Sequence, residues 1–360
     1  MGDSASGKTP LWIDCDPGHD DACAILLATY HPELHLLGIS SVYGNTSLVQ
    51  TTYNTLSVLE LLQNIHVPVF AGASQPFCRP LVTGEFFHGA NGLAGTDLMP
   101  EPTFSAKSEQ NAIEQMYKAL MATEKHTAWL VAIGPLTNIA LLFTTYPEVC
   151  HHIKGLSIMG GVVGDGFSDG SSSATASQGT FNPFVEFNIA CDPESARCVF
   201  QSYAKLVENV VLVPLDLTHQ VRATSERMEG LRKGKHGPTR LRRAFYELLK
   251  FCADSYAKHS ELKDGAPLHD PLAVAVLLPN HASTLATLSY DDGSIERWKI
   301  DVILEGSDAG RLVVSKSAAG GILIPRTMDA DWFWSLFEDC MARADEVTGF
   351  KTGRETSANL

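Results

Sequence analysis

Short apolar runs of strand length alternate with helical patterns through the first two-thirds of the chain. The apolar runs contain few polar positions, which is typical of parallel strands in a sheet that is covered on both faces. The expected strands are Pro10–Asp14, Leu36–Val42, Val67–Ala71, Ala128–Ile133, Ile153–Met159 and Val210–Val213. The expected helices include Asp20–Tyr30, Leu48–Leu62, Leu136–Phe143, Leu272–Leu278 and Asp329–Arg343.

This alternation predicts an α/β fold: a single domain with a mostly parallel, Rossmann-like central sheet flanked by helices. We expect the domain to span residues 10–347, between a disordered N-terminal tail (1–9) and a C-terminal tail (348–360). A Gly- and Ser-rich stretch at 164–180 is typical of an inserted, mobile surface loop. Arg222–Arg243, the only basic concentration, is expected to form a solvated pair of helices.

Composition and charge narrow the functional classes. The 360 residues are 44% hydrophobic and 19% charged, as in a globular protein with a sizeable core. The net charge of −14 disfavours nucleic acids and anionic membranes as partners. Without a long apolar run or a signal peptide, the sequence predicts a cytoplasmic protein. The Cys residues form no CxxC pair, and five are expected to be buried free thiols: Cys15, Cys23, Cys191, Cys198 and Cys252.

The most informative segment follows the first expected strand: Asp14-Cys15-Asp16-Pro17-Gly18-His19-Asp20-Asp21. Its four carboxylates lie around a Pro-Gly turn, and their mutual repulsion is tolerable when a cation neutralises it. Carboxylate oxygens suit a hard ion, Ca²⁺ or Mg²⁺, better than zinc. Capping of the following helix explains only one or two of the four carboxylates. The segment therefore predicts a metal site.

A haloacid-dehalogenase-type phosphatase is the main alternative. In that class the first Asp of an Asp-x-Asp after the first strand is a nucleophile, which here is Asp14. Gly164-Asp165 with Asp169 fits a later acidic element of the same class. Two features oppose this interpretation. Pro17 replaces the residue that, in those phosphatases, usually leads to a small hydroxyl residue. The last two Asp of the segment add negative charge where a phosphate must enter.

The same segment resembles the Asp-x-Asp-Pro-Gly-x-Asp-Asp signature of the inosine-uridine-preferring nucleoside hydrolases. Further motifs follow in the order of that family, over roughly residues 10–340. They are Val42-Tyr43-Gly44-Asn45, Phe87-His88-Gly89, Gly134-Pro135-Leu136-Thr137-Asn138, Ile158-Met159-Gly160-Gly161, Glu186-Phe187-Asn188, Asp192-Pro193-Glu194, Leu215-Asp216-Leu217-Thr218-His219 and His269-Asp270-Pro271.

The resemblance implies an N-glycosidase that uses Ca²⁺ and water to split a ribonucleoside into ribose and a free base. The implied ligands of the ion are Asp16, Asp21, Asp270 and the main-chain carbonyl of Ile133. The ion would bind the ribose 2′- and 3′-hydroxyls and a water beneath C1′. Asp16 would take the proton of that water as it attacks through an oxocarbenium-like transition state. His269 is the family's candidate for assisting the departing base.

The resemblance also implies a set of substrate contacts. They are Asp20, Asn45, Glu186 and Asn188 on the ribose, Met159 against the sugar, and His88 on a loop that closes over sugar and base. Tyr256, together with Phe86 and Phe87, is compatible with a contact to the base. If Glu186-Phe187-Asn188 is extended, its two polar side chains face the same way and Phe187 turns into the core.

One position departs from the family pattern. Many members place an Asn six residues before the glutamate of the Glu-Phe-Asn motif, where it reaches the ribose 5′-hydroxyl. Here Thr180 stands at that position and Asn182 lies four residues before Glu186. Either Asn182 has taken over the contact or Thr180 makes a shorter one.

The favoured function is hydrolysis of ribonucleosides, with uridine preferred because of a resemblance to uridine-active eukaryotic members, and inosine among the other candidates. A non-catalytic ribose- or nucleoside-binding protein is a further alternative. The family forms homodimers or homotetramers, so a homo-oligomer is implied. The signature, Glu186–Asp192 and Asp216–Gln220 contain no Lys or Arg, which predicts a pocket for a neutral nucleoside and not for its 5′-phosphate.

Overall fold

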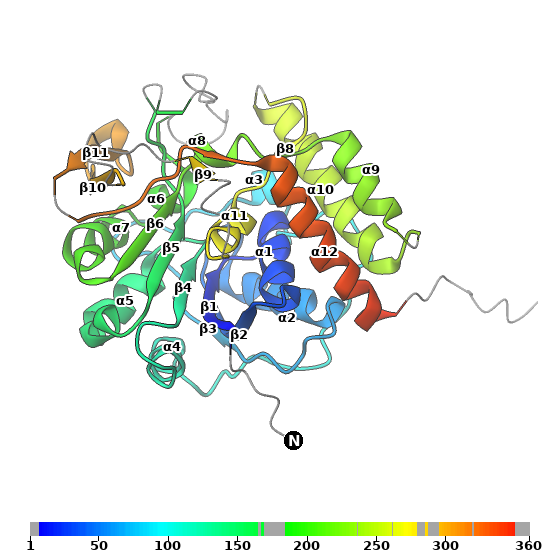
Figure 1. Cartoon of the computed structure of the whole chain (residues 1–360), viewed down its shortest axis with the longest axis horizontal. Coiled ribbons are helices and arrows are strands. Elements are labelled where there is room, and N and C mark those ends of the chain that lie inside the picture. Colours follow the sequence, from blue (N-terminus) through cyan, green and yellow to red (C-terminus); the bar gives the residue numbers. More distant parts are fainter. Residues whose placement is uncertain are drawn as a thin grey trace, which may run out of the picture.

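A computed structural model describes residues 7–164, 167–168, 184–235, 237–260, 262–278, 285–286, 295–318 and 320–349. Its six-stranded sheet consists of β1 (Thr9–Cys15), β2 (Leu34–Ser41), β3 (Val69–Ala71), β4 (Trp129–Ala132), β5 (Gly155–Met159) and β6 (Asn209–Val213). The order is β3-β2-β1-β4-β5-β6, and all neighbours are parallel (Figure 1). This sheet confirms the predicted α/β fold.

The strand order reverses between β1 and β4. The chain builds outward from β1 through β2 to β3, returns to the other side of β1 as β4, and continues to β5 and β6. In doubly wound sheets, ligands bind in the crevice beyond the carboxyl ends of the strands at such a switch point. Asp16 follows β1 and Ile133 follows β4 at this edge.

Helices cover both faces of the sheet (Figure 1). Side chains alternate along β1, so that Leu11 and Ile13 belong to one core and Trp12 to the other. The first core holds α1 (His19–Tyr30), α2 (Leu48–Leu61), α9 (Ser225–Lys233), α10 (Arg240–His259), α11 (Asp270–Ala275) and α12 (Ala330–Thr348). The second holds α4 (Ala112–Met121), α5 (Thr137–Thr145) and α7 (Pro193–Cys198).

Shorter elements complete the described chain. The short α-helices are α3 (Glu85–His88), α6 (Phe187–Cys191) and α8 (Leu215–Thr218). The 3-10 helices are η1 (Pro147–His151), η3 (Ala204–Leu206) and η5 (Gly306–Asp308), and η2 (Val199–Tyr203) is a π-helix. The antiparallel pairs are β7 (Arg222–Ala223) with β8 (Ala266–Pro267), β9 (Leu285–Ala286) with β12 (Thr327–Met328), and β10 (Arg297–Val302) with β11 (Leu312–Ser317). Each helix in the described part of the chain is too short or too polar to cross a lipid bilayer.

Some expectations need correction at the ends of elements. The first strand starts at Thr9, inside the expected tail, and α11 ends at Ala275, before Leu278. Cys198 is only partly buried, whereas the other four expected thiols are buried. The described part of the 164–180 insertion is limited to Gly164 and two residues at 167–168, and residues 350–360 of the expected C-terminal tail also lie outside the described chain.

The basic segment does form the expected pair of helices, α9 and α10, but it is wrong to call all of it solvated. Arg242, a residue of α10, is 1% exposed, and its side chain contacts α9 and α12. Its guanidinium donates to Asp345 at 2.5 Å, to Glu338 at 2.7 Å and to the Leu231 carbonyl at 2.7 Å. A buried cation requires such partners, because desolvation without them is costly.

Removing one of these partners should destabilise the fold. We expect Asp345→Ala to lower the free energy of unfolding by about 3 kcal/mol, since it leaves the buried Arg242 with only Glu338 as a carboxylate partner. Asp339→Ala, on the exposed face of the same helix, should change it by less than about 0.5 kcal/mol. Urea unfolding of both variants measures the difference, and equal effects would contradict the assigned role of Arg242.

Candidate active site

A cavity lies at the carboxyl ends of the central strands, beside the switch point. It gathers most of the predicted site residues from distant parts of the sequence. Its walls include Asp20, Asn45, His88, Ile133, Met159, Glu186, Asn188, Tyr256, His269 and Asp270. Asp16 and Asp21 are buried directly behind this wall, next to Asn45. Asn182 and Thr180 lie outside the described residues.

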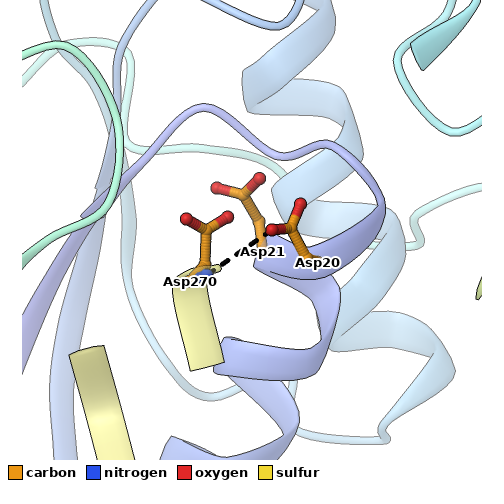
Figure 2. A group of neighbouring side chains, drawn as sticks. All are labelled: Asp20, Asp21 and Asp270. Atoms are coloured by element: carbon orange, nitrogen blue, oxygen red, sulfur yellow. Dashed lines mark hydrogen bonds between the residues drawn. The ribbon is translucent and has the colours of Figure 1, made fainter. Parts of the chain in front are cut away.

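Three carboxylates converge from two helix starts. Figure 2 shows Asp20 and Asp21 at the beginning of α1 and Asp270 at the beginning of α11. An oxygen from each of the three lies within 4.8 Å of the others. Asp21 Oδ2 accepts a 2.8 Å hydrogen bond from the Gly18 amide, which caps α1. Asp20 Oδ2 accepts from the amides of His269 and Asp270 at 3.2 and 3.4 Å, which ties the two helices together.

Asp16 is the fourth carboxylate of this group. Its Oδ2 accepts a 2.7 Å hydrogen bond from the Asn45 amide, and its own amide donates to Asp21 Oδ1 at 3.2 Å. Its buried Oδ1 accepts no hydrogen bond from the described residues. Glycine is needed on both sides, because a Cβ at Gly44 or Gly134 would lie 2.0 or 2.6 Å from the carboxylate oxygens. Asp16 is therefore closely packed, and its Oδ1 is still free to accept a ligand or a hydrogen bond.

Burial makes this concentration of carboxyl groups unfavourable. It raises the pKa of Asp16 and of Asp270 well above the ordinary value, with repulsion from neighbouring Asp residues adding to the effect. The pKa of Asp21 rises to about 7, mainly through burial and then through Asp20. Among the described residues that line the cavity there is no Lys or Arg to offset these charges.

A bound cation would supply the missing positive charge. The chemistry of the donors fits a hard divalent ion, because all of them are oxygens. The Ile133 carbonyl faces the same cavity, where it accepts a 3.1 Å hydrogen bond from Asn188 Nδ2. The buried Oδ1 of Asp16 also has no hydrogen-bond partner among the described residues, and unlike the equally unpartnered Oδ1 of Asp14 it belongs to a carboxylate next to Asp21.

Next to Asp270 in the chain, the His269 side chain is fixed between two hydroxyl groups. Its Nδ1 lies 2.7 Å from Thr218 Oγ1 and its Nε2 lies 2.5 Å from Tyr256 Oη. Burial lowers the pKa of His269 to about 3, so that the ring is neutral. One proton therefore lies between His269 and Tyr256, within the cavity that the carboxylates also face.

The Glu186-Phe187-Asn188 segment is not extended, so the side-chain directions expected for an extended segment do not apply. Glu186 is the N-cap of α6 and accepts hydrogen bonds from the amides of Asn188 at 2.8 Å and Ile189 at 3.1 Å. It accepts a third, at 3.0 Å, from Gly161. Because the residues after Glu186 are helical, Phe187 is only partly buried: it lines the cavity and packs against a small apolar cluster that includes Tyr43. Asn188 lies 3.5 Å from Met159 Sδ.

Several residues of the site carry no clear signal in the sequence. His19, the variable position of the acidic segment, contacts His88 and is completely buried. Thr218 contacts His269, and Cys252 and Phe187 complete the apolar wall. A single residue of a common type has no pattern that predicts such a contact, because the contact joins segments far apart in the chain.

Asp14 does not belong to the cavity. It is completely buried in the sheet, where its Oδ2 accepts hydrogen bonds from Ser40 and, at 2.7 Å, from Asn138. Burial raises its pKa to about 7. Because no substrate can reach this carboxylate, the phosphatase alternative loses its nucleophile. The second acidic element of that alternative, Asp165 and Asp169, lies outside the described residues.

Comparisons with known proteins identify relatives of this chain. A family model described as inosine-uridine preferring nucleoside hydrolase matches residues 11–335. The uridine nucleosidase of Saccharomyces cerevisiae is 33% identical over 354 residues, which cover 95% of this chain and 98% of the relative. A pyrimidine-specific ribonucleoside hydrolase of Escherichia coli is 38% identical over 289 residues, covering 80% of this chain and 83% of the relative.

A similar fold occurs among solved structures. The purine-preferring ribonucleoside hydrolase from Gardnerella vaginalis superposes with a TM-score of 0.77 at 25% identity, covering 94% of this chain and 99% of that one. An inosine-guanosine nucleoside hydrolase gives a TM-score of 0.74 at 25% identity, covering 92% and 98%. The similarity therefore extends over nearly the whole chain and includes the elements that carry the carboxylates.

The carboxylate group should bind a divalent cation. We expect CaCl₂ or MgCl₂ to raise the melting temperature of the wild type by several degrees, because a ligand that binds only the folded state stabilises it. Asp21→Asn should lose most of this increase. Asp14→Asn is the matched control and should keep it, since Asp14 lies outside the cavity. A wild type without any increase, or equal losses in the two variants, would contradict the cation site.

Proposed function

Since the chain belongs to the inosine-uridine-preferring nucleoside hydrolase family, we propose that it is a Ca²⁺-dependent ribonucleoside hydrolase that prefers uridine. The observation that carries this proposal is the meeting of the Asp16, Asp20, Asp21 and Asp270 carboxylates with the His269–Tyr256 pair around one cavity. The preference for uridine rests on the relatives that are named for uridine and pyrimidine nucleosides.

The ion would be held by Asp16, Asp21, Asp270 and the carbonyl of Ile133. When bound, Ca²⁺ supplies an electrophile for the vicinal ribose hydroxyls and lowers the pKa of a coordinated water. As the family resemblance implies, we assign Asp21 to the ion and Asp20 to a ribose hydroxyl, and Asp20 lines the cavity in which a sugar would lie. The amides of α11 hold the Asp20 carboxylate in place for this contact.

Asp16 would be the base that takes a proton from the attacking water. Its Oδ2 accepts one hydrogen bond from the Asn45 amide and its Oδ1 accepts none from the described residues, so the carboxylate has lone pairs left both for the ion and for the proton. Burial and the neighbouring carboxylates raise its pKa in the metal-free protein, and a bound cation would lower it again, so that Asp16 is ionised and can accept the proton. The oxygen of that water forms a bond to C1′ of the ribose while the bond from C1′ to the base breaks.

The ribose would lie between the carboxylates and the wall formed by Met159, Glu186 and Asn188. Backbone amides fix the Glu186 carboxylate, so it can accept from a sugar hydroxyl without moving. Asn188 Nδ2 already contacts Ile133 and Met159, which orients its amide oxygen. These contacts pre-arrange polar partners for the sugar, and such pre-arrangement favours the reaction.

The His269–Tyr256 pair would give a proton to the departing base. The 2.5 Å hydrogen bond holds a proton at this place, and the Thr218 contact fixes the ring from the other side. Aromatic side chains surround the pair, with the Phe87 ring 4.5 Å from the Tyr256 ring. The proton that the base gains is balanced by the proton that Asp16 takes from the water, so that the overall reaction consumes one water.

Substitution of Asp16 tests the proposed base. Asp16→Asn keeps an oxygen ligand and an acceptor for the Asn45 amide but cannot take a proton, so we expect kcat with uridine to fall about 10²- to 10⁴-fold. The assay measures released ribose at saturating Ca²⁺. Asp14→Asn serves as the control, because Asp14 is a nearby carboxyl group on β1 that does not line the cavity. Near-normal hydrolysis by Asp16→Asn with Ca²⁺ bound would contradict the mechanism.

The leaving-group pair can be tested with two substrates. We expect Tyr256→Phe and His269→Ala to lower kcat/KM for uridine at least about tenfold. The loss should be much smaller for p-nitrophenyl riboside, because nitrophenolate departs without a proton. Tyr246→Phe is the matched control on the same helix, since Tyr246 is not part of the cavity wall. Equal losses on both substrates would show that the pair does not act on the leaving group.

The absence of Lys and Arg from the described cavity wall predicts selection against nucleotides. We expect uridine 5′-monophosphate to be hydrolysed about a hundredfold or more less efficiently than uridine, because the phosphate meets uncompensated carboxylates. A panel of uridine, cytidine, inosine, adenosine and xanthosine, assayed for reducing sugar, determines the base preference in the same experiment. Comparable rates for uridine and its monophosphate would contradict the prediction that the negative charge of the cavity excludes nucleotides.

A further inference from the structure

His19 joins the active-site loop to the start of α1. Its Nδ1 lies 3.0 Å from His88 Nδ1, and its Nε2 lies 2.9 Å from the carbonyl oxygen of Ala94. The side chain is completely buried and is not part of the cavity wall, whereas His88 is. His19 therefore touches the proposed site only through another histidine.

The two imidazole rings meet edge to edge. The planes of the two rings differ by only 20°, and the ring centroids are 5.2 Å apart. This separation is close to the distance between the two Nδ1 atoms plus one ring radius on each side, so both nitrogens lie near the line that joins the centroids. This is the geometry of an N–H···N hydrogen bond that lies in the plane of both rings. The Phe251 ring lies 5.2 Å from His19 at an interplanar angle of 18°, which holds the orientation of His19.

The hydrogen-bond partners determine where the protons lie. A carbonyl oxygen only accepts, so His19 Nε2 must donate to Ala94. In a neutral ring the other nitrogen is then an acceptor, and His19 Nδ1 must receive its hydrogen from His88 Nδ1. Once His88 carries its hydrogen on Nδ1, its Nε2 has a free lone pair.

The contacts of both rings fit neutral imidazoles, as this assignment requires. The completely buried His19 ring has a carbonyl oxygen and an imidazole nitrogen as its hydrogen-bond partners, which one donor and one acceptor nitrogen satisfy. Burial lowers the pKa of His88 well below the ordinary value, and the adjacent His19 and His269 rings add to the effect. The Nδ1 edge of His88 packs so closely on the backbone that a Cβ at Gly18 would lie 2.6 Å from this nitrogen. A turn of the His88 ring is thereby restricted.

We propose that His19 is a positioning residue that fixes the tautomer of His88, so that His88 Nε2 accepts a hydrogen bond from the bound nucleoside. The donor is either the N–H of a uracil-type base or the ribose 5′-hydroxyl, since the 2′- and 3′-hydroxyls are assigned to the carboxylates. The substrate contact rests on the proposed function. The tautomer of His88 does not depend on it and can be measured in the free protein.

The first test is a nuclear magnetic resonance spectrum of protein labelled with ¹⁵N in its histidines. We expect His88, identified by the signals lost in His88→Asn, to show a protonated Nδ1 and an unprotonated Nε2. His19→Asn places an amide oxygen where His19 Nδ1 was and should preserve this state. His19→Gln reaches only toward Ala94 and should shift His88 toward the Nε2-protonated tautomer. A wild-type His88 with its hydrogen on Nε2 would overturn the proposal.

The second test compares kinetics of the same two variants. We expect kcat/KM for uridine to be about tenfold lower in His19→Gln than in His19→Asn, the size of effect that one lost hydrogen bond produces. The difference should disappear for the one analogue that lacks the donor, 3-methyluridine or 5′-deoxyuridine. A ratio that is unchanged with both analogues would overturn the substrate contact.

These outcomes separate two kinds of failure. If the wild type hydrolyses no nucleoside, the proposed function fails, and the spectrum still decides whether His19 sets the tautomer of His88. If uridine is hydrolysed but His19→Asn and His19→Gln leave the same His88 spectrum, the proposed function stands and the inference about His19 fails. Thermal unfolding curves of both variants identify a temperature at which both are folded, and the spectra and kinetics are compared at that temperature.

Discussion

Mutual repulsion among buried carboxyl groups is the constraint on which this site depends. Asp16, Asp20, Asp21 and Asp270 lie together at the switch point of the sheet, where burial alone would favour their neutral forms. Backbone amides at the starts of α1 and α11 offset part of the charge. A divalent cation would offset more, and it would turn an unfavourable cluster into a binding site for vicinal hydroxyls.

The histidines around the cavity follow a different principle, because they are neutral groups held by hydrogen bonds. His269 lies between Thr218 and Tyr256, and His88 is bound to His19. Burial lowers the pKa of these histidines, so each has one donor and one acceptor nitrogen. The carboxylates thus concentrate negative charge where the ribose would bind. The neutral histidines and Tyr256 hold protons in fixed hydrogen bonds where the base would depart.

The mostly parallel sheet with its helical cover and the acidic cluster could be predicted from the sequence, because both leave local patterns. Uniform apolar runs indicated the parallel strands, and the density of carboxylates after β1 indicated the cation site. The burial of Arg242 and the helical backbone after Glu186 could not be predicted, since each depends on partners elsewhere in the fold. The implied roles of the site residues, the Ca²⁺ ligands and the homo-oligomer stay predictions.

The most direct test of the account is a titration of metal-free protein with Ca²⁺ while uridine hydrolysis is followed. The account predicts negligible release of ribose without the ion, and activity that rises with added Ca²⁺ until about one ion is bound per chain. Full hydrolysis of uridine by the metal-free protein would contradict the central claim that the carboxylate cluster works through a bound cation.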